Sequence, residues 1–259
     1  MKTHTVDVNT WEGQLLHVVC LAVLLVIAWY GWHFSGRDFT AIFWFAVSIP
    51  VIHQVFVWLA WRLELKHSLV SSTIGFQAYL VVFFGLFLLR FASLALLGWV
   101  DAGSLEIHSV LRMLLLVICL VPGIYTMYSV RRYFGLKRAA GGDHFEVEYQ
   151  SMELVRKGIF QFTSNGMYVY AFLLFWAIAI YFSSLASLVV ALFSHLYIWV
   201  HYYCTERPDM ETIYGARQIN PDKYTQIKLV RSTIFIFLYF CSLEEPYSRS
   251  VFCERRTVF

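Results

Sequence analysis

The sequence predicts an all-α fold, a polytopic transmembrane bundle of about six helices that ends in a C-terminal helical hairpin. The composition is the first reason, because the 259 residues are 59% hydrophobic and 19% aromatic but only 14% charged. Soluble domains carry about 25% charged residues. The second reason is that the apolar residues gather in long runs, and about 20 apolar residues cross a bilayer as one helix. Helices are expected because lipid offers the backbone no hydrogen-bond partners.

Six apolar runs are the candidate spans. They are residues 15–32, 39–61, 69–100, 110–130, 167–181 and 185–203. Pro50 predicts a kink in the second run, and the third run is long enough to tilt or to extend beyond the bilayer. The last two runs are short and meet at a Ser-Ser turn, which predicts a tight hairpin. A further run, 234–241, is too short to span and is expected at the membrane interface or against the bundle.

The loop charges predict the orientation of the bundle. Lys and Arg are concentrated after the second, fourth and sixth runs, so the positive-inside rule places both termini in the cytoplasm. Residues 1–13 show no signal-peptide pattern, which makes the first run a retained span of a multi-pass integral membrane protein. The net charge of +3 does not indicate a nucleic-acid partner. The five cysteines include no CxxC pair, so we expect free thiols and no metal site.

Two polar segments lie at the two feet of the predicted hairpin and are therefore expected to be close in space. The first, 156–168, contains Thr-Ser-Asn-Gly at 163–166, which is typical of a helix start. The N–H groups of a helix start also bind anions, so the same residues are consistent with a carboxylate site. The second, 205–215, contains Glu206, which is either a solvated charge at a helix end or a ligand for an ammonium group. Together the two segments suit the amino-acid end of S-adenosylmethionine.

Histidine and aromatic residues precede the second polar segment at helical spacing. Tyr197, His201 and Thr205 are four residues apart and share one helix face. Such residues more often pack in a core than form a site. We assign His201 to the site because it lies nearest to the polar foot.

Several short motifs follow one another at the spacing of a known family pattern. They are Gly-Ile-Phe at 158–160, Asn-Gly-Met-Tyr at 165–168, and the stretch from Glu206 to Gly215. With these motifs, residues 125–225 resemble the integral-membrane methyltransferase superfamily of isoprenylcysteine carboxyl methyltransferases and phospholipid N-methyltransferases. The sequence departs from the family pattern at Ser164, Gly166 and Arg207, where the family has Arg, Pro and a second Glu. These departures leave the substrate, and the activity itself, open.

The resemblance implies methyl transfer from S-adenosyl-L-methionine to a lipophilic or membrane-embedded acceptor, which is a lipid amine, a prenyl-cysteine or a thiol. Residues 1–124 carry no motif and are expected to form an accessory bundle, whereas 125–259 form a methyltransferase-like region with a cytoplasmic cofactor pocket. If the acceptor is an amine, His201 and Glu206 are the candidates for a general base. The expected cofactor-binding residues are Phe160, Ser164, Asn165, Met167, Tyr168, His201 and Glu206.

Two other functions are compatible with the sequence. One is an NADPH-dependent membrane reductase of the sterol type, and the other is a non-catalytic membrane protein with a degenerate methyltransferase fold. In the second case His53 and Arg90, which are ionisable residues inside predicted spans, are candidates for a transport pathway. For Arg90 we expect instead that the side chain snorkels to the membrane surface or forms an ion pair inside the bundle.

Overall fold

The all-α prediction is confirmed in a computed structural model that describes residues 9–153 and 155–214, a part of the chain that contains no strand. Five helices of this part are long and apolar enough to cross a membrane, and a shorter apolar one, Met167–Phe182, completes the predicted set. The predicted interfacial run 234–241 lies outside the described residues.

The helices follow the predicted runs closely. The long ones are α1 (Gln14–Ser35), α2 (Thr40–His67), α4 (Gly75–Val100), α5 (Ser109–Ser129), α8 (Leu173–Phe182) and α9 (Leu185–His201). The short ones are α3 (Leu69–Thr73), α6 (Leu136–Ala139), α7 (Val147–Gln150) and α10 (Arg207–Tyr214). Single turns of π-helix cover Val130–Phe134, Met167–Ala171 and Tyr202–Glu206, and 3₁₀ turns cover Gly142–His144 and Gly158–Gln161.

The third predicted run, 69–100, is not one helix. It is broken at Ile74 into the single-turn helix α3 and the long helix α4. Gly75 has a φ of +79°, and a left-handed residue cannot continue a right-handed helix. The side chain of Glu64 fixes the short piece, because its carboxylate accepts the backbone N–H of Ser71 at 2.8 Å. The expectation of one continuous span over 69–100 is therefore wrong, and the helix that is long enough to cross a membrane is Gly75–Val100.

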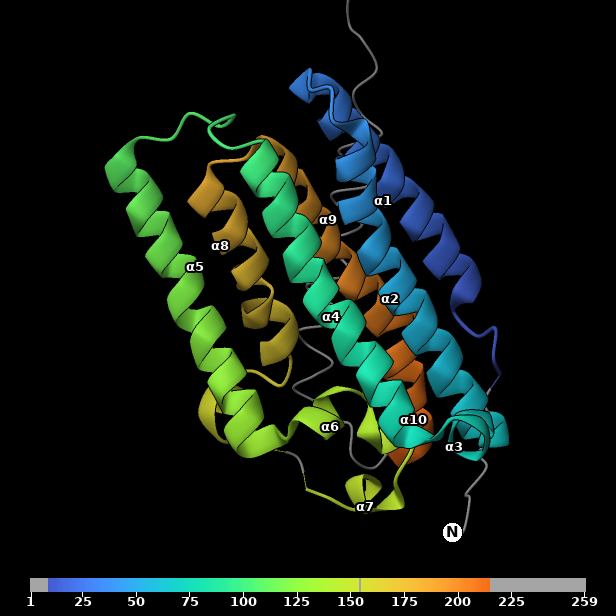
Figure 1. Cartoon of the computed structure of the whole chain (residues 1–259). Helices are drawn as coiled ribbons and strands as arrows, with labels where there is room; N and C mark the ends of the chain where they lie inside the picture. The colour runs from blue at the N-terminus through green and yellow to red at the C-terminus, as the bar shows by residue number, and fades with distance from the viewer. Residues whose placement is uncertain (1–8, 154, 215–259) are drawn as a thin grey trace, which may run out of the picture. The chain divides into compact units, whose positions relative to one another are not determined.

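Helix α9 is the centre of the bundle and packs against α1, α2, α4 and α8, whereas α5 packs mainly against α8. Figure 1 shows α3, α6, α7 and α10 gathered at one end, which we call the polar end. The loop from α4 to α5 lies at the other end. Both feet of the hairpin, 158–171 and 202–206, belong to the polar end.

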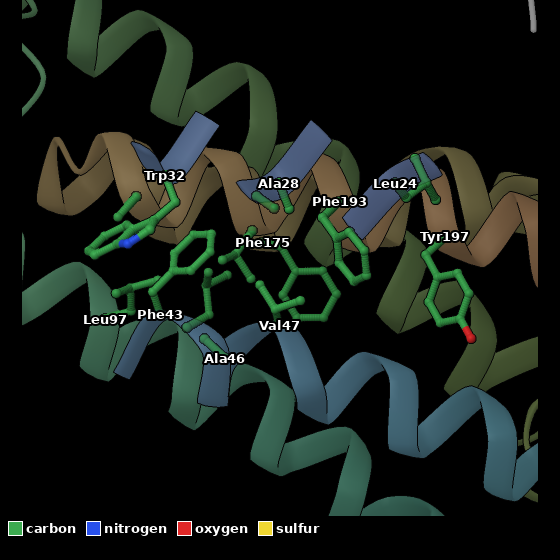
Figure 2. Packing of buried hydrophobic residues seen from close by; sticks show 14 of the residues in the cluster. Leu24, Ala28, Trp32, Phe43, Ala46, Val47, Leu97, Phe175, Phe193 and Tyr197 are labelled. Carbon is green, nitrogen blue, oxygen red and sulfur yellow. The ribbon is translucent and has the colours of Figure 1, made fainter. Parts of the chain in front are cut away.

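The core joins the first two helices to the hairpin (Figure 2). Trp32 of α1 stacks on Phe43 of α2 with ring centroids 4.5 Å apart, and Phe193 of α9 lies in the same cluster. Alanines at the contacts, such as Ala28 and Ala186, have almost no exposed surface. Small residues let membrane helices approach closely, so these helices pack as one bundle.

Asp101 closes the end of the hairpin that lies opposite the polar end. Its Oδ2 atom accepts hydrogen bonds from the hydroxyls of Ser104 and Ser184 at 2.6 and 2.7 Å and from the N–H of Ala186 at 2.9 Å. Ser183, with a φ of +50°, makes the turn. The predicted tight hairpin is confirmed, and its two feet are directed to the polar end together.

Candidate functional site

The two feet of the hairpin meet at Tyr168 and Glu206. The hydroxyl of Tyr168 donates a hydrogen bond to Oε2 of Glu206, across 38 positions of sequence. The Tyr168 ring also contacts Tyr202 and Trp199, with ring centroids 5.4 and 5.9 Å apart. A carboxylate is thus held beside three aromatic rings.

Both residues lie in π-helical turns. Tyr168 belongs to Met167–Ala171 and Glu206 to Tyr202–Glu206, and the third π turn, Val130–Phe134, precedes the loop of the same end. A π turn places an extra residue in the helix, and such turns are frequent at functional sites. The insertions change which side chains point across the hairpin, which is why a regular helical spacing did not predict this contact.

Phe160 and Met167 form an apolar wall next to this pair of feet. Phe160 is buried and stacks on Phe134, with ring centroids 5.2 Å apart. Met167 packs against the same cluster, which also contains Val130 and Ile159. These two predicted cofactor residues therefore lie together, and they are held from the end of α5 rather than from the hairpin alone.

Gly158 explains how the 3₁₀ turn carrying Phe160 packs so closely on α5. Its φ is +65°, and a Cβ atom at this position would lie 2.5 Å from Oγ of Ser129. The same Oγ accepts the N–H of Ile159 at 3.1 Å. Only glycine satisfies both the backbone conformation and the close approach.

Ser164 and Asn165 lie at the edge of the site. Ser164 is exposed and Asn165 is half-buried. The Asn165 carbonyl accepts the N–H groups of Tyr168 and Val169 at 3.0 and 3.1 Å, so Asn165 begins the helical segment as its sequence predicts. The residue that contacts Glu206 is Tyr168, and no contact of Asn165 with Glu206 is observed among the described residues.

His201 lies away from Tyr168, on the face of α9 that packs against α1 and α2. Its ring is 2% exposed and lies 5.6 Å from Trp61 and 6.2 Å from His17, measured between ring centroids. Neither of its ring nitrogens has a hydrogen-bond partner among the described residues. The structure therefore pairs Tyr168 with Glu206 and packs Phe160 with Met167, whereas His201 packs against Trp61 and His17.

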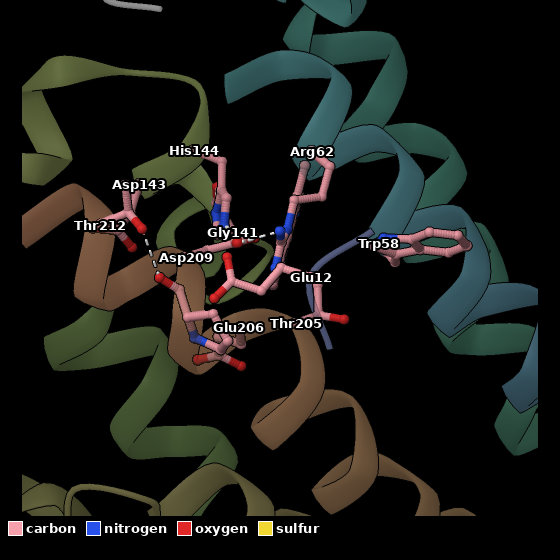
Figure 3. Close-up of polar contacts among 12 residues, drawn as sticks. Glu12, Trp58, Arg62, Gly141, Asp143, His144, Thr205, Glu206, Asp209 and Thr212 are labelled. Carbon is pink, nitrogen blue, oxygen red and sulfur yellow. Dashed lines mark hydrogen bonds and ion pairs between the residues drawn. The ribbon is translucent and has the colours of Figure 1, made fainter. Parts of the chain in front are cut away.

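A buried ion network lies beside the site, and the sequence did not predict it. Asp209 of α10 has no exposed surface, and its two oxygens face Arg62 Nε at 2.7 Å and His144 Nε2 at 3.2 Å. Figure 3 shows these side chains converging from α2, from the 142–144 turn and from α10. His144 also stacks on Trp61, with ring centroids 4.0 Å apart. The sequence signal was only that Arg62 ends an apolar run and Asp209 lies in a polar segment.

A second network ties the loop after α5 to α10. Arg138 and Asp143 form a buried ion pair at 3.2 Å, and the hydroxyl of Tyr214 donates to the same carboxylate oxygen. The amide of Gln150 donates to the Asp143 carbonyl at 2.9 Å. The polar end is therefore held by paired charges on both sides of α10.

The first helix also reaches the second foot. The side-chain amide of Gln14 donates to Oγ1 of Thr205 at 3.1 Å and to the carbonyl of Cys204 at 3.3 Å. Gly13, at φ +77°, approaches so closely that a Cβ atom would lie 2.4 Å from the Cys204 oxygen. The turn that presents Glu206 is thus supported by the N-terminal helix.

Comparison with known proteins links this region to one family. Residues 111–217 match the family described as phospholipid methyltransferase. No curated protein and no solved structure matches the chain. The matched stretch contains both feet of the hairpin and Asp209, whereas Arg62 and Gln14 lie outside it.

Proposed function

Because residues 111–217 of this chain match the phospholipid methyltransferase family, we propose that the protein transfers a methyl group from S-adenosyl-L-methionine to a lipophilic acceptor in the membrane. The observation that carries the proposal is the hydrogen bond between Tyr168 and Glu206, which unites the two polar feet within the matched stretch. We further propose that residues 1–124 support this region and that the polar end faces the cytoplasm, where the Lys and Arg of the loops place it.

The residues at the two feet fit the chemistry of S-adenosylmethionine. A carboxylate binds an ammonium group through charge-assisted hydrogen bonds, and Glu206 supplies one. Aromatic faces attract a cationic centre, and Tyr168, Trp199 and Tyr202 lie within 6 Å of one another by ring centroid. The same ligand supplies the activated methyl group when it is bound.

The chain itself contributes binding, orientation and exclusion of water. Tyr168 holds the carboxylate of Glu206 by donating its hydroxyl proton. Phe160 and Met167 pack in one apolar cluster at the first foot, which supports the turn that carries Tyr168. In a methyl transfer, the acceptor must lie in line with the bond that breaks, so the main catalytic effect of such a site is positioning. An acceptor dissolved in the bilayer would approach between helices.

The departures from the family pattern have local explanations. At Gly166 a Cβ atom would lie 2.9 Å from Cγ2 of Ile159, so a larger residue does not fit without movement. Arg207, at the position of the second family glutamate, forms an ion pair with Glu211 at 2.8 Å. These changes alter the surroundings of Glu206 and leave the class of acceptor open among lipid amines, prenyl-cysteines and thiols.

The direct test is binding of S-adenosylmethionine to the purified protein in detergent, measured by calorimetry. We expect binding by the wild type and about tenfold or greater weakening by Glu206→Gln, because a hydrogen bond to a charged group contributes about 1.5–3 kcal/mol. Glu211→Gln is the matched control, since it removes a carboxylate from α10 that faces Arg207. Equal affinity of the wild type and Glu206→Gln would remove Glu206 from the site.

Thermal unfolding in the presence of each cofactor distinguishes this function from the alternatives. S-adenosylmethionine should raise the unfolding temperature and NADPH should not, because ligands that bind only the folded state stabilise it. Stabilisation by NADPH alone would indicate a reductase. Stabilisation by neither ligand would favour a protein without catalytic activity. Radiolabelled methyl transfer into a total lipid extract then identifies the acceptor.

A further inference from the structure

Arg90 is a cation buried in the middle of the bundle. It is 4% exposed, and its Nε and Nη2 atoms have no hydrogen-bond partner among the described residues. It lies ten residues before the end of α4 at Val100, which is about 15 Å along a helix. The expectation that Arg90 snorkels is therefore wrong, because the side chain stays inside. Of the alternative, a partner inside the bundle, the described residues show no carboxylate paired with Arg90.

The neighbours of Arg90 do not compensate its charge. The guanidinium carbon lies 5.2 Å from the ring centroids of both Phe172 and Phe175. Cation–π attraction is favourable but smaller than the cost of removing an unpaired charge from water. An uncompensated buried charge is expected to neutralise, to unfold the site or to bind a counter-ion.

Two buried histidines on neighbouring helices also lack hydrogen-bond partners among the described residues. Both ring nitrogens of His53 and both of His201 lack hydrogen-bond partners among the described residues, and the two rings are each 2% exposed. His53 lies on α2 and His201 on α9, two helices that pack against α4. Tyr197 of α9 is hydrogen-bonded through its hydroxyl to Nε2 of His17 at 2.9 Å. In Figure 2, Tyr197 lies at one end of the packed cluster of α1, α2 and α9. These groups come from α2, α4 and α9, so the polar region lies between helices rather than on one of them.

From this arrangement we propose that the interior between α2, α4, α8 and α9 binds the acidic group of a lipid-soluble molecule, with Arg90 as its principal ligand. The unpartnered groups are the guanidinium of Arg90 and the imidazoles of His53 and His201, and their N–H groups can donate hydrogen bonds to an oxyanion. Internal water would satisfy the histidines but would not balance the guanidinium charge. A carboxylate or phosphate carried by an amphiphile accepts hydrogen bonds from the histidines and also balances the guanidinium charge.

The depth of the site determines the kind of molecule. An anion that reaches the middle of a membrane needs an apolar part, because a free ion is strongly disfavoured there. The buried rings of Phe172 and Phe175 place apolar surface against the guanidinium. A long-chain fatty acid and a phosphatidic acid share the required chemistry. This site is separate from Tyr168 and Glu206, and the proposal does not depend on methyl transfer.

The test compares ligands on delipidated protein in a neutral detergent, by thermal unfolding. Oleate and lysophosphatidate are the two amphiphilic arms, oleyl alcohol is the neutral control, and inorganic phosphate is the arm without a chain. We expect a saturable rise of the unfolding temperature with at least one anionic amphiphile and none with oleyl alcohol. A rise with inorganic phosphate alone would contradict the lipid-soluble ligand, and no rise with any anion would overturn the site.

Arg90→Met separates a binding residue from a structural one. Methionine keeps the length of the side chain without its charge, so the ligand-free variant should unfold at a higher temperature than the wild type and lose the saturable response. Arg112→Met is the matched control, because Arg112 donates to Ser183 near the opposite end and should leave the response unchanged. A retained response in Arg90→Met would overturn the proposal. If Arg90→Met does not fold, mass spectrometry of lipid extracted from wild type and from Arg90→Gln decides, since the neutral glutamine should not retain the stoichiometric anionic lipid found in the wild type.

Discussion

Asp209 is the residue on which the polar end depends most. Its carboxylate is fully buried and binds two side chains, Arg62 and His144, that come from distant parts of the sequence. A buried ion pair adds little over an apolar substitute, but removal of one partner leaves the other as an uncompensated charge. The ion pairs of Asp209 therefore fix the position of α10 against α2, and with it the position of Glu206, which directly precedes α10.

Asp209→Asn should destabilise the protein by about 3–5 kcal/mol, the range for breaking a buried pair. Chemical or thermal unfolding in detergent measures the loss. The double variant Arg62→Met/Asp209→Leu should recover much of it, because no buried charge is then unpaired. Unchanged stability of Asp209→Asn would show that Arg62 finds another partner and that the network has no structural role.

At this scale the sequence predicted Tyr168, Glu206, Phe160 and Met167; the structure joins Tyr168 to Glu206 by a hydrogen bond and packs Phe160 and Met167 in one apolar cluster. The prediction rested on the order of the motifs along the chain, which is local information. It missed the partnership of Arg62 and Asp209, because 147 positions separate them and both were interpreted as loop charges. His201 was assigned to the site by its distance along the sequence, whereas the helical rotation of α9 directs its ring to the opposite face.

The elements that matter for the site are short and irregular. The long helices were predictable because their apolar runs are continuous, and their observed ends lie close to the predicted ones. The break before α4 was not predictable from composition, since Ile74 and Gly75 interrupt no apolar run and only the left-handed conformation of Gly75 reveals it. The π turns could not be predicted from the sequence either, because a one-residue insertion in a helix leaves the types of residue unchanged.

Gly158→Ala tests whether the 3₁₀ turn positions the wall of the site. The new Cβ atom would meet Ser129 in an unfavourable backbone conformation, so we expect a loss of about 1–3 kcal/mol in stability. Affinity for S-adenosylmethionine should fall with it, because Phe160 lies two residues away.

Gly85→Ala is the matched control for that change. A Cβ atom on Gly85 in α4 would meet nothing within 4 Å, so this variant should be neutral or about 0.5–1 kcal/mol more stable. Equal behaviour of the two variants would show that the close approach at Gly158 is easily relieved.

For the whole molecule, the arrangement of the helices agrees with a membrane protein whose polar loops and turns collect at one end. The first two helices share a core with the hairpin, so the region that matches the methyltransferase family is packed within a larger bundle. The direction in which the bundle is inserted into the membrane is predicted from the loop charges alone, independently of how the helices pack.

Labelling of single-cysteine variants tests this direction of insertion. Gln161→Cys lies at the polar end and Glu106→Cys in the loop from α4 to α5, and both native residues are exposed. With a membrane-impermeant maleimide on intact cells, the cysteine at position 106 should react and the one at 161 should react only after lysis. The wild type controls for its native thiols. The reverse pattern would place the polar end outside and would separate it from intracellular S-adenosylmethionine.

The contact of Gly13 and Gln14 with Cys204 and Thr205 has a practical consequence. The beginning of α1 contacts Cys204 and Thr205, the two residues directly before Glu206. A substitution at Gly13 or Gln14 therefore acts directly on the turn that carries Glu206. Affinity measurements are best made on protein whose leading segment is left in its natural form.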